Sequence, residues 1–132
     1  MSSKSVAEKL LIKPGTSVWS SDASRLDLIE PLPDGVRTVD GPGDATTALV
    51  FAEDASSLRD VLETHRDELA RPSALWIAYP KGNRTDVNRD SLWPILGHYG
   101  MRPITQVSVD EVWSALRFRL LKEGEAPFTG GR

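Results

Sequence analysis

Residues 74–80 read ALWIAYP, a run in which apolar side chains occupy nearly every position. A second run, TTALVFA at 46–52, is equally apolar and rich in β-branched residues. Uninterrupted runs of this length are typical of strands buried on both faces, as in a parallel sheet covered by helices on each side. The two runs therefore predict the centre of a parallel sheet.

Helical patterns alternate with these strands. The clearest lies between residues 54 and 70, where Leu58, Val61 and Leu62 follow the helical period, Asp54 is a candidate N-cap and Pro72 a stop. Weaker patterns predict short helices near 5–12 and 22–32, a helix beginning near 90, and short strands at 16–20 and 36–39. Strands and helices that alternate in this way favour right-handed crossovers between parallel strands.

The end of the chain differs in character. The runs ITQVSV (104–109) and VWSALRFRL (112–120) are separated by two acidic residues and predict an antiparallel pair, with 112–120 as the outer strand. The predicted fold is α/β, a three-layer Rossmann-like sandwich with a mostly parallel sheet and a C-terminal antiparallel hairpin. We expect a single α/β domain over 1–121 and a flexible tail over 122–132.

Composition excludes several classes of function. The 132 residues carry a net charge of −3 and no cysteine, so neither a global positive field for nucleic acid nor a thiol nucleophile exists. The apolar runs are far shorter than the ~20 residues of a membrane-spanning helix, and the first residues, MSSKS, lack the apolar core of a secretory signal. We therefore expect a cytoplasmic protein that binds neither nucleic acid nor membrane.

A polar loop follows the run at 74–80. Its cations Lys81, Arg84 and Arg89 could hold a carboxylate or phosphate together with backbone amides at the start of the next helix. Asp86 could equally neutralise these cations, and Asn88 could simply cap the helix. The loop is thus either a ligand clamp or a solvated connection, and both interpretations stay open.

A second candidate is Asp40, which follows the strand at 36–39 where an acidic ribose-binding residue is expected in nucleotide-binding folds. The loop at 20–24, SSDAS, lacks the glycines that such folds place after their first strand, and Asp40 precedes a glycine, which is also ordinary turn chemistry. No catalytic residue, metal ligand or cofactor is predicted. The candidate ligand-binding residues are Lys81, Arg84, Asp86, Asn88, Arg89 and Asp40.

Four segments carry a resemblance to a known family: KPG at 13–15, LWIAYPKG at 75–82, TDVNRDSLW at 85–93 and VDEVWSALRFR at 109–119. They resemble a family of small bacterial proteins of unknown function, and the order of elements is similar to that of Rossmann-like methyltransferases. The resemblance implies no activity. It implies a set of family-pattern residues, Lys81, Asp86, Asn88, Arg89, Asp90 and Trp113.

The leading prediction is a non-catalytic Rossmann-like module that binds a protein partner or a small anionic ligand through the 81–90 loop. The alternative is a small divergent methyltransferase-like enzyme with Asp40 and Asp86 near a cofactor. A third hypothesis is a structural subunit that self-associates, and the oligomeric state, including a homodimer, stays open.

Overall fold

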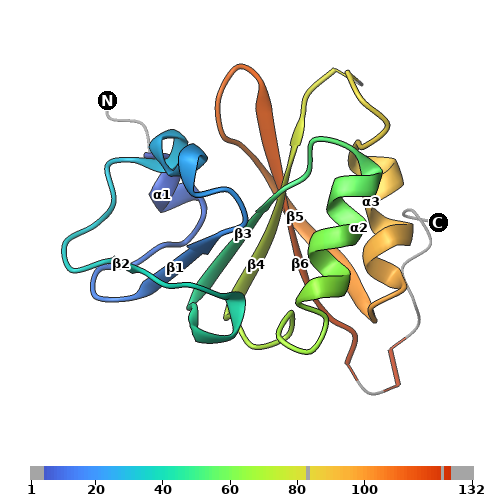
Figure 1. Ribbon diagram of the computed structural model, residues 1–132, viewed down its shortest axis with the longest axis horizontal. Coiled ribbons are helices and arrows are strands. Elements are labelled where there is room, and N and C mark those ends of the chain that lie inside the picture. Colours follow the sequence, from blue (N-terminus) through green and yellow to red (C-terminus); the bar gives the residue numbers. More distant parts are fainter. Residues whose placement is uncertain (1–4, 83, 123, 126–132) are drawn as a thin grey trace.

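The computed structural model describes residues 5–82, 84–122 and 124–125, and the backbone alone of Arg89. Its strands are β1 (Ser17–Ser20), β2 (Arg37–Thr38), β3 (Thr47–Phe51), β4 (Ala74–Pro80), β5 (Met101–Ser108) and β6 (Trp113–Leu120). Its helices are α1 (Val6–Lys9), α2 (Ala55–Thr64) and α3 (Arg89–Gly97), with two 3₁₀ helices, η1 (Ala23–Ile29) and η2 (Pro42–Asp44). Figure 1 shows α1 on one side of the sheet and α2 and α3 on the other.

The six strands form one sheet in the order β2-β1-β3-β4-β6-β5. β1 pairs in parallel with β2 and β3, and β3 pairs in parallel with β4. β6 is antiparallel to both β4 and β5, so it is the reversed strand among those described. The predicted fold class, a Rossmann-like α/β sandwich with a mostly parallel sheet and a C-terminal antiparallel pair, is confirmed.

The position of the antiparallel pair differs from the prediction. β6 lies inside the sheet between β4 and β5, and β5 is the outer strand. Exposure follows this order, because the first four residues of β6 are all buried whereas most of β5 is half-buried or exposed. The expectation of an outer strand at 112–120 is therefore wrong: the alternating pattern reports the pairing of two strands but not which of them meets β4.

Side chains on β4 alternate between two cores. Leu75, Ile77 and Tyr79 belong to the core beneath α2 and α3. Trp76 and Ala78 belong to the core on the side of α1 and η1, where the Trp76 indole Nε1 donates to the carbonyl of Leu10 at 3.0 Å. Burial of both faces explains the unbroken apolar run, and it makes β4 the central strand around which both layers pack.

The helix predicted between 54 and 70 is shorter than its pattern. Asp54 is its N-cap, as expected, and shares a capping box with Ser57. The α-helix ends at Thr64, and the following residues form turns that still bury Leu69. Apolar spacing therefore continues past the end of the helix because Leu69 belongs to the same core.

Within 5–82, 84–122 and 124–125, no helix has the length and apolar character needed to cross a bilayer. The predicted flexible tail, 122–132, falls mostly outside the described residues, which include Lys122, Gly124 and Glu125 of that segment.

Candidate functional site

The carboxyl ends of β1, β3 and β4 lie at one edge of the sheet, because these strands run in parallel. The chain leaves β1 toward β2 on one side and returns to form β3 on the other side of β1. Such a reversal leaves a crevice beyond the strand ends, where open α/β sheets bind their ligands. The loops that follow β1, β2 and β3 therefore define the candidate site.

Arg25 lies beyond the ends of β1 and β3, where the strand order reverses. Its Nε lies 3.1 Å from Oδ2 of Asp22, and its Nη2 lies 2.6 Å from Oε1 of Glu53, the second residue after β3. The centre of the guanidinium is 4.7 Å from the ring centroid of Trp113 and 5.9 Å from that of Phe51. A cation thus sits between two carboxylates on an aromatic surface.

The two rings beneath Arg25 form a rigid floor. Phe51 and Trp113 meet edge to face with centroids 5.3 Å apart, and both are buried. The pKa of Asp22 lies below its ordinary value, mainly because the hydroxyl of Ser24 donates to the carboxylate. Asp22 is therefore ionised at neutral pH and holds Arg25 in place.

Three backbone amides directly after β1 already have partners. Those of Ser21, Asp22 and Ser24 donate to the Leu49 carbonyl, the Ser20 hydroxyl and the Asp22 carboxylate respectively. A glycine-rich loop would instead leave such amides facing a ligand. The loop after β1 thus presents side chains to the crevice in place of backbone donors.

Asp40 lies two residues beyond β2, at the same edge of the sheet, and is exposed. β2 neighbours β1, so the carboxylate follows the strand adjacent to the crevice. The 81–90 loop, in contrast, follows β4, which is three strands away from β2, or roughly 14 Å at the usual strand spacing. The predicted candidates therefore fall into two groups on one edge.

Most described candidates of the 81–90 loop make local contacts. The Nζ of Lys81 donates to the Ser108 hydroxyl at 2.6 Å and so ties the loop to the end of β5. Asn88 caps α3, because its Oδ1 accepts from the amides of Asp90 and Ser91. Arg84 is exposed. The side chain of Arg89 lies outside the described residues.

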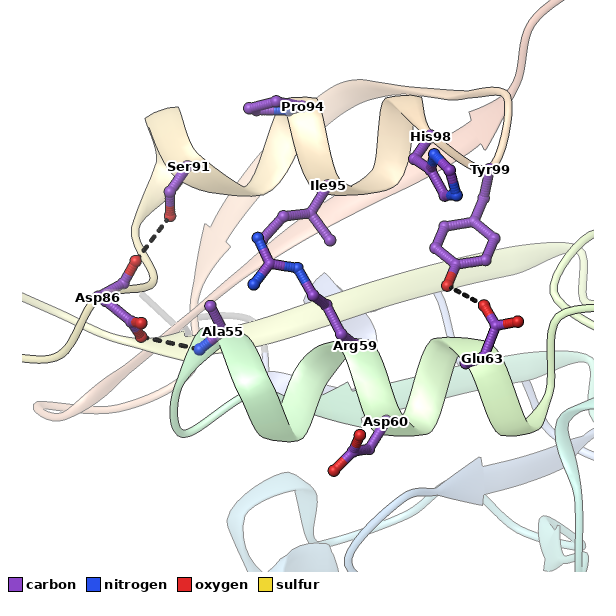
Figure 2. Close-up of a pocket in the computed structure, with 10 residues that line it drawn as sticks. All are labelled: Ala55, Arg59, Asp60, Glu63, Asp86, Ser91, Pro94, Ile95, His98 and Tyr99. Atoms are coloured by element: carbon purple, nitrogen blue, oxygen red, sulfur yellow. Dashed lines mark hydrogen bonds between the residues drawn. The ribbon is translucent and has the colours of Figure 1, made fainter.

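Asp86 joins the loop to the neighbouring helix. Its Oδ1 accepts from the amide of Ala55 in the first turn of α2 at 2.8 Å, and its carbonyl accepts from the hydroxyl of Ser91 on α3 (Figure 2). A carboxylate at a helix N-terminus satisfies a donor and complements the helix dipole. Asp86 therefore holds the start of α2 and the start of α3 together.

This contact gives a stability prediction. Asp86→Ala is expected to lower the free energy of unfolding by about 1 kcal/mol, the usual effect of losing a helix cap, and thermal or urea unfolding measures it. Asp86→Asn keeps an acceptor oxygen and should lose less. Equal stability of all three proteins would show that the carboxylate does not support α2.

A groove of about 850 Å³ runs between α2 and α3. Figure 2 shows Arg59 projecting from α2 toward Ile95 of α3, and the Tyr99 hydroxyl donating to Glu63 at 2.7 Å. This hydrogen bond lowers the pKa of Glu63, while the pKa of Tyr99 is raised, first by burial and then by the same bond. The groove lies on the helical face, apart from Arg25.

Sequence reasoning missed the cluster of Arg25, Asp22, Glu53, Phe51 and Trp113. Its members come from three segments far apart in the chain and meet through the order of the strands. One local signal existed, since Asp22 and Arg25 stand three positions apart directly after a strand. In the described part of the chain, no group of three or more His, Asp or Glu side chains is placed to hold a metal ion.

The reversed strand β6 and the change of direction in strand order at β1 are typical of a Rossmann-like fold. The chain is similar to a protein in the NADB-Rossmann superfamily from Streptococcus agalactiae, with a TM-score of 0.59 and 12% identity over 98% of this chain and 72% of that one. It is also similar to a proposed tRNA (m1A22) methyltransferase from Streptococcus pneumoniae, with a TM-score of 0.57 and 13% identity over 98% and 74% of the two chains. A structure of the pneumococcal protein in complex with S-adenosyl-L-methionine is a further match.

The m1A22 tRNA methyltransferase of Bacillus subtilis is similar as well, with a TM-score of 0.53 and 13% identity over 92% of this chain and 68% of that one. A scan against protein-family models and a search of curated proteins find no match. The likeness to these solved structures is one of fold. It contradicts the leading prediction of a non-catalytic binding module and favours the methyltransferase-like alternative, because the proteins that share the fold include methyltransferases.

Proposed function

We propose that this chain is a small methyltransferase-like domain that binds S-adenosylmethionine at the carboxyl ends of β1, β2 and β3. The observation that carries the proposal is the reversal of strand order between β1 and β3, in a sheet whose described strands all run one way except β6. The structure of one similar protein in complex with S-adenosyl-L-methionine supports the choice of ligand.

The charged side chains at this edge of the sheet suit the ligand. S-adenosylmethionine combines a ribose with a zwitterionic amino acid, and when bound it supplies a methyl group on a sulfonium for transfer to a nucleophile. The exposed carboxylate of Asp40 follows β2, where it can accept from ribose hydroxyls. Arg25, Asp22 and Glu53 present one cation and two anions for the amino acid group.

One feature departs from other nucleotide-binding sites. The loop after β1 has no glycine, and its amides at Ser21, Asp22 and Ser24 are already bonded. Side chains must therefore replace backbone amides in holding the amino acid group. The cations Lys81 and Arg84 follow β4 at the same edge, and we assign them to an anionic methyl acceptor.

We also propose that the chain belongs to a bacterial family of small proteins, that it is cytoplasmic, and that residues 1–121 form a single domain. In this proposal the 81–90 loop binds the methyl acceptor, whereas the sequence alone had suggested that it binds a protein partner or a small anion.

Isothermal titration of the full chain with S-adenosylmethionine tests the binding step. We expect saturable heat with one site per chain. Asp40→Asn should weaken binding about tenfold or more, because hydrogen bonds to a charged group contribute about 1.5–3 kcal/mol.

Asp60→Asn is the matched control, because Asp60 is another exposed carboxylate but lines the groove between α2 and α3. It should bind the ligand as the unaltered chain does. An absence of heat up to millimolar ligand would refute the proposed function.

A further inference from the structure

The arginine in the crevice has a specific role that rests on the proposed function. We infer that Arg25 binds the carboxylate of the ligand's amino acid group and that Glu53 occupies Arg25 until the ligand arrives. Arg25 thereby takes the part that backbone amides play in a glycine-rich loop. Its position, its ion-pair partners and its planar guanidinium support this role.

The position of Arg25 is set by the fold. It follows β1 in η1, and its guanidinium lies above Trp113 from β6 and Phe51 from β3. Because both rings are buried, the guanidinium lies over a fixed aromatic surface, and its side chain stays 30% exposed beyond the ends of β1 and β3. An arginine that stacks in this way keeps planar N–H groups for a bidentate carboxylate.

The present partners of Arg25 are exchangeable. The side chain of Glu53 is 61% exposed and that of Asp22 is 39% exposed, whereas that of Arg25 is 30% exposed. Ion pairs between exposed groups stabilise little, so a ligand carboxylate in the crevice can replace one of them. Glu53 is the one replaced, because Asp22 is also held by the amide and hydroxyl of Ser24.

The exchange conserves charge. When the ligand carboxylate displaces Glu53 from the guanidinium, the released glutamate becomes available to the ligand's ammonium group. A cation between two carboxylates is thus complementary to a zwitterion, which carries both charges on adjacent groups. A ligand that lacks the amino acid group gains nothing from this arrangement.

A comparison of two ligands by calorimetry separates this role from general binding. S-adenosylmethionine carries the amino acid group, and 5′-methylthioadenosine has the same nucleoside and a thioether without it. Arg25→Gln is expected to weaken S-adenosylmethionine binding by about tenfold or more and to change 5′-methylthioadenosine binding less than about twofold. Glu53→Gln removes both the carboxylate that competes for Arg25 and the acceptor for the ligand's ammonium group, so it should change S-adenosylmethionine binding less than Arg25→Gln does.

The matched control is Arg66→Gln, since Arg66 pairs with Glu63 at 3.0 Å on the surface of the chain and should leave both affinities unchanged. Melting temperatures report folding of each variant. Should Arg25→Gln fail to fold, Arg25→Lys keeps the charge but lacks the planar pair of N–H donors. It should still weaken the binding of S-adenosylmethionine more than that of 5′-methylthioadenosine.

The outcomes distinguish the two claims. If the unaltered chain binds neither ligand, the proposed function fails and the role of Arg25 fails with it. If the unaltered chain binds both ligands and the folded Arg25 variant shifts both affinities equally or neither, the role of Arg25 alone is refuted.

Discussion

Replacing Trp76 by alanine is expected to lower the free energy of unfolding by about 3–5 kcal/mol, the usual range for removing a large buried aromatic side chain. Trp76 is fully buried at the centre of β4. Its loss leaves a cavity beneath α1 and also leaves the Leu10 carbonyl without the indole donor that now lies 3.0 Å away. Urea unfolding monitored by far-ultraviolet circular dichroism measures the change.

Trp76→Phe separates the two contributions. It keeps most of the apolar volume and removes the donor, so we expect a smaller loss of about 1–3 kcal/mol from the unsatisfied carbonyl and the residual cavity. A protein with alanine at this position that unfolds at the same urea concentration as the unaltered chain would contradict the central place of β4 in the fold.

Replacing Ala115 by proline should destabilise the chain by about 3 kcal/mol or more, or prevent folding. Ala115 is fully buried and stands opposite Ala78 of β4 on one side and Val107 of β5 on the other. Proline has no N–H to donate and its ring crowds the neighbouring strand, so an interior strand cannot accept it. Soluble yield and thermal melting measure the effect.

Ile104→Pro is the control on the outer strand. Ile104 is 42% exposed and stands at the register shift between Pro103 and Thr105. Proline is tolerated at edges and bulges, so the expected loss is only about 1 kcal/mol. If the Ile104 variant were the less stable of the two, the order of β5 and β6 in the sheet would have to be reversed.

The extent to which the fold could be predicted depended on how local the signal was. The run at 74–80 matches β4 residue for residue, because burial on both faces leaves an unbroken apolar pattern. The Asp54 cap was equally visible, since capping depends on neighbours three residues apart. The position of β6 between β4 and β5 could not be predicted, because it depends on pairing with β4, a strand far away in the sequence.

The same distinction applies to the site. Asp40 was selected as a candidate from its spacing after the first strand, and the loop at 81–90 from its charges, and the binding roles of both stay predictions. Arg25 could not be predicted, because its partners Glu53 and Trp113 are 28 and 88 residues away in the chain and meet it only in the folded sheet. Asp86 looked like a ligand-binding residue in sequence, and the structure gives it a contact with the first turn of α2.

Amide chemical shifts of ¹⁵N-labelled protein titrated with S-adenosylmethionine show where the cofactor binds. We expect saturable shifts in the loops after β1, β2 and β3, including the amides of Asp22, Asp40 and Glu53, with small changes in α2 and α3. Shifts confined to the groove between α2 and α3, or no shifts up to millimolar ligand, would contradict a cofactor site at the carboxyl edge of the sheet.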